Sequence, residues 1–328
     1  MQTFRILTPA LAGIAGWILT THGQTAFPEN FAEDPASTGW RAVGDSTLFQ
    51  WNEGNENLEV IWNSSTNNSY FLRPLGTILT KHDDFGFAFD LQLQNIAIGT
   101  TAGKPFTFQL AVGFIDLDAA TRTNFFRGTG MDSPNLVEFD YFPDSGFGAT
   151  VSPTVISSNM QFATSFNSPL ELTTNDWFHV ALAYTASNQT LTTVMTRNAD
   201  NFGPIQSVIL GPNFTDFRVD SFAVSSYSDA GQDPQYAGSI LAHGVIDNLV
   251  VATPGPPVSN LRGNLVNGVW QLEFISRTNW SYALERTENW QSWLPASPNT
   301  PGVDGTMVLV DTNASVPKAF YRVRAEIP

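Results

Sequence analysis

The chain contains no cysteine, and this absence removes several classes of site. None of its 328 residues can form a disulfide, a thiolate metal site or a cysteine nucleophile. Charged residues make up only 14% of the chain, and the 30 acids outnumber the 15 lysines and arginines. The resulting net charge of −15 argues against nucleic acid and anionic membranes as partners, because both need a basic surface.

Segments with the periodicity of a helix are also lacking after Phe27. Short runs of alternating apolar and polar residues recur instead, separated by Gly, Asn, Asp and Pro. The runs are 58–62, 85–93, 106–114, 137–141, 177–184, 191–196 and 245–251. Many short strands at this spacing predict an all-β sandwich or barrel. Abundant Ser, Thr, Asn and Gly are typical of an extracellular β-protein.

The N-terminus predicts export. Ile6–Leu19 is an apolar run of about 14 residues that follows Arg5, within the range of a secretory signal and short of the ~20 residues of a membrane span. We therefore expect a signal peptide over 1–26 and a secreted protein without membrane insertion after cleavage. An uncleaved anchor is the alternative.

A domain boundary is predicted at Thr253–Pro257, where three prolines in five residues indicate a stiff linker. Residues 25–257 hold 24 acids and 8 bases, whereas 258–328 hold 6 of each. The acidic character thus belongs to a larger domain, 27–252. Residues 258–328 form a small β-domain with strands expected at 268–275, 281–286, 307–311 and 320–325.

The segment Asn135–Asp144 poses the sharpest question. In a strand, Glu138, Asp140, Phe142 and Asp144 point to one face, because side chains two residues apart share a face. Three acids on one face repel each other, which calls for a bound cation, a cationic partner or a role as general acid and base. A solvated outer face is the remaining alternative.

Three segments carry a resemblance to a known fold. Residues 177–194, 244–251 and 135–144 together resemble the jelly roll of the concanavalin A-like lectins and glucanases, including laminin-G-like and legume-type lectin modules. This resemblance implies that Glu138 and Asp140 bind a transition metal, and that Asp140, the Phe142 carbonyl and Asp144 bind calcium. Ala149 and Thr154 depart from the metal ligands of that family, and residues 101–104 lack its sugar-orienting Asp. A single calcium ion remains the implied cofactor.

Hydrolysis is the catalytic alternative, because laminarinase-type glycoside hydrolases share this fold. The resemblance implies Glu138 as nucleophile and Asp140 as its helper, but Phe142 and Pro143 stand where the acid/base Glu is expected. A glycoside hydrolase or a polysaccharide lyase therefore stays open as the second hypothesis.

Non-catalytic recognition of a polysaccharide or cell-surface glycan is the leading hypothesis. Trp62 and Tyr70 flank an Asn-rich loop, and aromatic faces with nearby amides and carboxylates suit sugars. Asn124 and Arg127 are expected to line the same cleft as Glu138 and Asp140. A structural or adhesive surface protein is the third hypothesis. Residues 258–328 are similar in layout to fibronectin-III-like modules of secreted bacterial proteins, from which no function follows.

Overall fold

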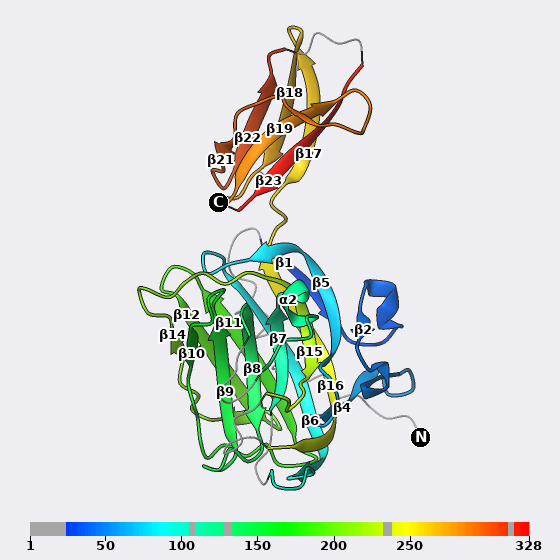
Figure 1. Cartoon of the computed structure of the whole chain (residues 1–328), viewed down its shortest axis with the longest axis vertical. Helices are drawn as coiled ribbons and strands as arrows, with labels where there is room; N and C mark the ends of the chain where they lie inside the picture. The colour runs from blue at the N-terminus through cyan, green and yellow to red at the C-terminus, as the bar shows by residue number, and fades with distance from the viewer. Residues whose placement is uncertain (1–23, 105–108, 128–132, 232–237, 314–317, 328) are drawn as a thin grey trace. The chain divides into compact units, whose positions relative to one another are not determined.

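The computed structural model describes residues 24–104, 109–127, 133–231, 238–313 and 318–327. The chain divides into two compact units, Met1–Pro254 and Gly255–Pro328, and in the described part of each the regular secondary structure is almost entirely antiparallel strand (Figure 1). The predicted all-β class is confirmed.

One layer of the larger unit is an antiparallel sheet that has nine strands in the described part of the chain. Along its main path the order is β13-β12-β11-β6-β16-β4-β3, while β1 pairs with β16 and β14 with β12. These strands are β1 (Gln24–Glu29), β3 (Phe49–Asn52), β4 (Asn57–Asn63), β6 (Phe85–Ile98), β11 (Trp177–Thr185), β12 (Thr190–Arg197), β13 (Asp200–Phe202), β14 (Val208–Ile209) and β16 (Ile240–Pro254).

The other layer is an antiparallel sheet with seven strands among the described residues, in the order β10-β9-β8-β7-β15-β5-β2. Its strands are β2 (Arg41–Val43), β5 (Ser69–Leu79), β7 (Leu110–Ile115), β8 (Leu136–Phe142), β9 (Thr150–Ile156), β10 (Phe162–Thr164) and β15 (Val219–Ser226). Three short helical turns lie in the connections that the structure describes: η1 (Pro35–Thr38), η2 (Ser46–Leu48) and α2 (Leu117–Ala120).

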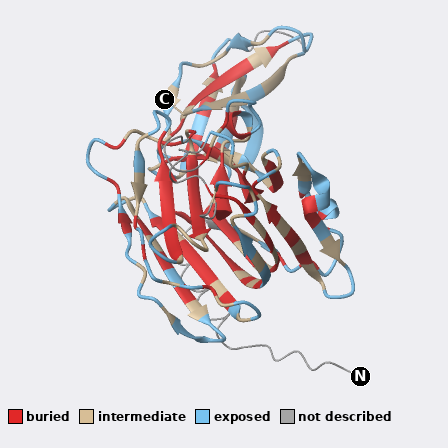
Figure 2. Cartoon of the chain, turned by 60° about the horizontal axis from the view of Figure 1, so that its bottom comes forward, coloured by how far each residue is buried: buried red, intermediate tan, exposed pale blue. Residues whose placement is uncertain are grey.

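Aromatic rings join the two layers. Phe87 of β6 meets Phe114 of β7 at 5.5 Å between ring centroids and Phe222 of β15 at 5.0 Å, both edge-to-face. The strands around them are buried along most of their length (Figure 2). Edge-to-face pairs add to the large apolar area that each ring buries. This core makes the unit a jelly-roll sandwich, as predicted.

Two predicted boundaries fall at strands of the structure. The predicted signal boundary at residue 26 falls inside β1, where Thr25 and Ala26 pair with Thr253 and Ala252. Residues 1–23 lie outside the described residues. Thr253 and Pro254 end β16, so only Gly255–Pro257 of the expected linker lies beyond the strand. A proline is tolerated at the last position of a strand because the ladder does not continue past it.

The smaller unit is a second sandwich. Among its described residues, one sheet has the order β17-β18-β22 and the other has β20-β19-β21, with β23 paired to β19. The strands are β17 (Ser259–Val266), β18 (Val269–Ile275), β19 (Ser281–Thr287), β20 (Leu294–Pro295), β21 (Thr300–Pro301), β22 (Thr306–Asp311) and β23 (Phe320–Glu326). The four strands expected here are confirmed. β17 was not predicted, because its side chains are nearly all exposed and show no alternation.

Helices are few and short in the described part of the chain, and none there has the length and apolar character that a membrane span needs.

Candidate functional site

The acidic strand is β8, and it directs its two central acids away from the core. Val137, Phe139 and Tyr141 belong to the hydrophobic core, as predicted. Glu138 and Asp140 lie on the opposite face, where Gly113 and Ala111 of β7 are their partners across the sheet. Both acids are nevertheless completely buried. A solvated outer face is therefore wrong, and something on this face must stabilise the two carboxyl groups.

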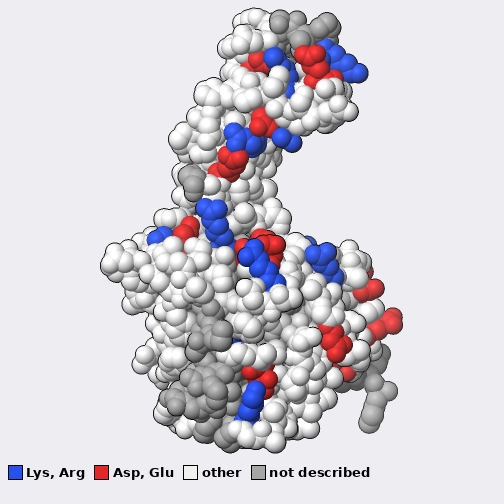
Figure 3. All heavy atoms as spheres, in the orientation of Figure 1, with Lys and Arg blue, Asp and Glu red and all other residues white. Residues whose placement is uncertain are grey.

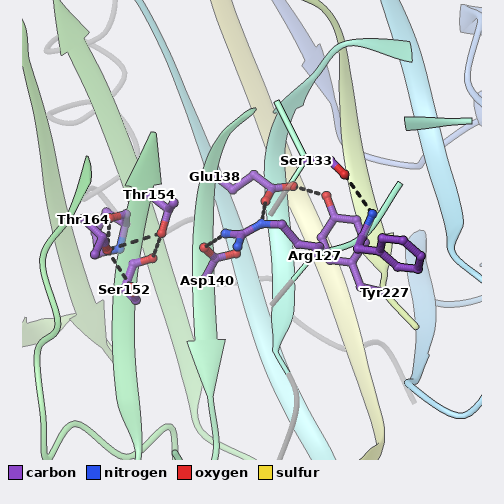
Figure 4. Close-up of polar contacts among 10 residues, drawn as sticks. Arg127, Ser133, Glu138, Asp140, Ser152, Thr154, Thr164 and Tyr227 are labelled. Atoms are coloured by element: carbon purple, nitrogen blue, oxygen red, sulfur yellow. Dashed lines mark hydrogen bonds and ion pairs between the residues drawn. The ribbon is translucent and has the colours of Figure 1, made fainter. Parts of the chain in front are cut away.

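Arg127 is the group that does so. Its Nε lies 3.1 Å from Glu138 Oε2, and its Nη2 lies 2.6 Å from Asp140 Oδ2 (Figure 4). The guanidinium is itself buried, at 3% exposure. Its planar fork can engage two carboxyl groups at once. Of the alternatives that the repulsion between the acids left open, the cationic partner is thus the one that the chain uses.

A tyrosine completes the cluster. The Tyr227 hydroxyl donates a hydrogen bond to Glu138 Oε1. The Tyr227 ring packs between Phe125, at 6.1 Å between ring centroids, and Tyr70, at 5.9 Å. The charged cluster, meaning Arg127, Glu138, Asp140 and Tyr227, is therefore closed by aromatic rings.

Local hydrogen bonds fix the segment that carries Arg127. Asp116 caps α2 by accepting from the Ala119 amide at 2.8 Å. Further on, the Phe126 amide donates to Ser133 Oγ at 2.8 Å, and the Ser133 amide donates to the Phe126 carbonyl at 2.9 Å. These bonds fix the residue directly before Arg127, so the guanidinium is delivered to the sheet in one orientation.

A glycine makes room for Glu138. A Cβ added to Gly113 would lie 2.3 Å from the Val137 carbonyl oxygen and 2.6 Å from Glu138 Cα. Both are backbone atoms, which cannot rotate away as the end of a side chain can. Gly113 is thus required for β7 and β8 to approach closely beneath the charged cluster.

Burial changes the protonation of the cluster. Desolvation and the neighbouring Asp140 raise the pKa of Glu138 from its usual 4.5 to about 8, against the opposing effects of Arg127 and Tyr227. Burial, reinforced by Glu138, also raises the pKa of Tyr227 well above 10. Both carboxyl oxygens of Glu138 accept a hydrogen bond, from Arg127 Nε and from the Tyr227 hydroxyl, so the raised pKa of Glu138 reflects burial and the nearby Asp140 rather than a lack of partners. Glu138 is also 0% exposed, which does not fit the predicted role of a nucleophile that must reach a substrate.

The predicted calcium site does not fit these residues. Asp140 faces a guanidinium, which would repel a metal ion at the same carboxylate. Asp144 lies beyond the end of β8, and its Oδ1 accepts from the Gly146 amide at 2.9 Å. Phe142 is the last residue of the strand. Within the described residues, no three His, Cys, Asp or Glu side chains are arranged to hold a metal ion.

The predicted aromatic and amide contacts need correction as well. Trp62 and Tyr70 do flank a loop, but each ring is only 1% exposed and belongs to the hydrophobic core. The Tyr70 hydroxyl donates to the Ala120 carbonyl at 3.0 Å. A buried ring cannot stack on a sugar in solution. Asn124 is exposed in the turn after α2, whereas Arg127 contacts Glu138 as a buried ion-pair partner and not as the lining of an open cleft.

Sequence reasoning missed a row of hydroxyl groups beside the acids. Ser152 and Thr154 of β9 are the cross-strand partners of Asp140 and Glu138, and Thr164 of β10 pairs with Thr154. The Ser152 and Thr164 hydroxyl oxygens lie 2.7 Å apart, and Thr164 Oγ1 lies 3.3 Å from Thr154 Oγ1 (Figure 4). This hydroxyl row runs from the charged cluster to the edge of the sheet. Ser152 and Thr154 are each only 1% exposed, whereas Thr164, at the edge, is partly exposed.

Two exposed phenylalanines stand at that edge. Phe162 and Phe166 are 46% and 66% exposed, and their ring centroids lie 6.5 Å apart. Ala163 packs on the core, so Phe162 and Thr164 point outward together. We call Phe162 and Phe166 the phenyl pair. The alternation of Phe162, Thr164 and Phe166 in the sequence is the signal that could have revealed it.

Comparison with known proteins gives a likeness in fold only. No family model matches the chain, and no curated protein matches it. Among solved structures, the chain is similar to peanut lectin in complex with a 9-residue peptide (14% identity, TM-score 0.45, 70% of this chain and 97% of the other). It is also similar to lectin II from Ulex europaeus (13% identity, TM-score 0.45, 70% of this chain and 98% of the other). A third similar structure is the marine PL-14 alginate lyase from Aplysia kurodai (11% identity, TM-score 0.41, 65% of this chain and 90% of the other). Nothing about the ligand of this chain follows from similarities of this size.

Proposed function

We propose that the larger unit is an exported, non-catalytic carbohydrate-binding module that binds a neutral polysaccharide along the β10 edge of the seven-stranded sheet. The observation that carries this proposal is the exposed phenyl pair beside Thr164, which is the partly exposed end of the hydroxyl row. Sugar rings stack on exposed aromatic faces, while their hydroxyl groups exchange hydrogen bonds with protein side chains.

Charge supports a neutral ligand. Residues 25–257 carry 24 acids and 8 bases, an excess of 16 negative charges that disfavours uronate or sulfated chains. On the face of the larger unit seen in Figure 3, charged side chains stand in small groups separated by neutral surface. Arg127, which pairs with Asp140 and Glu138 on this sheet, is buried and cannot offer its charge to an anionic ligand.

Recognition is favoured over hydrolysis because of the state of the charged cluster. Its two acids are 0% exposed and both are paired with Arg127, so neither meets a substrate at the surface. Its tyrosine keeps its proton. We therefore expect no release of reducing ends from neutral polysaccharides and no unsaturated products from uronates.

The test measures binding of the full chain to a panel of neutral polysaccharides by affinity electrophoresis. The panel includes β-glucans, mannan and galactan. The double variant Phe162→Ala/Phe166→Ala is expected to weaken binding about tenfold or more, as loss of a central aromatic contact does. Trp177→Ala is the matched control, since Trp177 is a 39% exposed aromatic on β11 of the other sheet. Binding is expected to be equal in calcium and in EDTA.

Three results would contradict the proposal. Unchanged affinity of the double variant would remove the phenyl pair from the site, and failure to bind any polysaccharide would favour the adhesive alternative. Product release that is abolished by Glu138→Gln would favour an enzyme.

A further inference from the structure

The smaller unit carries an exposed aromatic surface of its own. Trp290, in the loop after β19, is 62% exposed, and its ring centroid lies 4.1 Å from that of Phe320 on β23. Trp293 lies 5.9 Å from Trp290, edge-to-face. We call Trp290, Trp293 and Phe320 the tryptophan surface. Large exposed aromatic groups at one place are typical of binding sites.

A network of local hydrogen bonds holds Trp290 outward. Thr287 Oγ1 accepts from the amides of Asn289 and Trp290, at 3.3 and 3.0 Å. Asn289 Oδ1 accepts from the amides of Gln291 and Ser292, at 2.9 and 3.2 Å. Within this turn Trp290 has φ +65°, in the left-handed region that bulky residues rarely occupy. The chain thus maintains an unfavourable backbone conformation for a ring that stays mostly in solvent.

Cations flank the tryptophan surface. The Arg322 guanidinium carbon lies 4.3 Å from the centroid of Trp293, and Lys318 Nζ lies 5.5 Å from that of Phe320. Arg322 pairs with Glu285 at 2.7 Å, but Glu285 also contacts Arg324 at 3.0 Å. Arg324 pairs with Glu326 in addition. Lys318, Arg322 and Arg324 thus lie near the tryptophan surface, and Glu285 and Glu326 pair with the two arginines.

We propose that the tryptophan surface is a second, separate binding site, for an anionic polysaccharide. One sugar ring stacks on Trp290, while its carboxylate or sulfate accepts hydrogen bonds from Lys318 and Arg322. The anionic occupant follows from charge complementarity, because Lys318 and Arg322 lie against two rings of the tryptophan surface. The larger unit, with its negative excess, has the opposite preference. This inference does not depend on the function proposed for the phenyl pair.

The experiment compares two forms of one polymer against the full chain: polygalacturonate, which is anionic, and its methyl ester, which is neutral. Wild type is expected to bind polygalacturonate and to lose affinity as salt rises. Trp290→Ala is expected to weaken this binding at least tenfold, and Lys318→Gln about threefold with a shallower salt dependence. Leu265→Ala, which removes a 65% exposed side chain from β17, is the matched control and should bind like wild type.

Several results would contradict a site for an anionic polysaccharide on the tryptophan surface. Equal binding of the two polymers, or wild-type affinity in Trp290→Ala, would overturn the proposal. A third outcome is that wild type does not bind polygalacturonate and sediments as a dimer, while Trp290→Ala sediments as a monomer. The tryptophan surface would then be a contact between copies of this chain. The double variant Phe162→Ala/Phe166→Ala should leave polygalacturonate binding unchanged, so failure here is distinguishable from failure of the site on the larger unit.

Discussion

Arg127 in the larger unit and Arg322 in the smaller one both pair with glutamate, in opposite surroundings. Arg127 is 3% exposed and lies between two buried carboxyl groups. The Arg322 side chain is 51% exposed, shares Glu285 with Arg324 and rests on Trp293. Water screens the exposed pair and leaves it weak, whereas burial makes the enclosed partners depend on one another. The arginine–glutamate pairing therefore stabilises the fold at Arg127, whereas at Arg322 the guanidinium is exposed and available to a ligand.

The largest difference should appear when each arginine is removed. Arg127→Met leaves Asp140 and Glu138 buried without their cation, and breaking a buried pair costs about 3–5 kcal/mol. We expect this loss in the free energy of unfolding from urea titration. A loss below about 1 kcal/mol would contradict the structural role of the charged cluster.

Protonation of Glu138 offers a second way to test the buried side of the comparison. Its pKa is raised from 4.5 to about 8 on folding, so the folded state holds a proton that the unfolded state releases. The contribution of Glu138 to stability is complete below pH 4.5 and is lost as pH rises through about 8. The slope for one proton is at most ~1.4 kcal/mol per pH unit.

Glu138→Gln should flatten this slope, because an amide does not titrate. The measurement is the unfolding free energy of both proteins at several pH values between 5 and 8. Identical slopes in wild type and variant would show that Glu138 titrates normally in the folded protein.

Gly113→Ala tests the close approach beneath the cluster and should have an intermediate effect. The added methyl group meets backbone atoms at 2.3 and 2.6 Å, and overpacking of this kind costs about 1–3 kcal/mol. Gly211→Ala is the control, since nothing lies within 4 Å of its added Cβ. Equal melting temperatures for the two variants would refute the requirement for glycine at 113.

The smallest effect is expected at the exposed arginine. Arg322→Ala should change the unfolding free energy by about 1 kcal/mol or less, because solvent and salt screen its pairing with Glu285. The same variant should weaken binding of polygalacturonate. A loss of stability as large as that of Arg127→Met would erase the distinction between the two regions.

Much of the fold was predictable because a half-buried strand shows an alternation of apolar and polar residues in its own sequence. Residues 85–93 and 177–184 alternate clearly and form β6 and β11, and alternation in 137–141 placed the core side of β8 correctly. The same alternation groups Trp62 with Leu58 and Val60 on the core face, which would have corrected its predicted role as a sugar contact. β17 escaped prediction because an exposed strand has no apolar periodicity.

The site was predictable only in part. Repulsion among the acids of β8 required a compensating charge, and Arg127 was placed near Glu138. However, the resemblance to lectins favoured a metal ion for Asp140, and no spacing distinguishes a metal from an arginine 11 and 13 residues earlier in the chain. Whether the charged face was open or covered also had no local signal.

By itself the sequence determined the all-β class and part of the strands, the side of β8 that faces the core, the lack of thiol chemistry and the excess of acid in the larger unit. Those properties depend on residue type and on neighbours along the chain. Only the tertiary structure decided that Arg127 neutralises Asp140, that Trp62 is buried and that Phe162 and Phe166 stand exposed beside hydroxyl groups. These outcomes depend on which segments fold across which sheet, and burial then sets the strength of every charge involved.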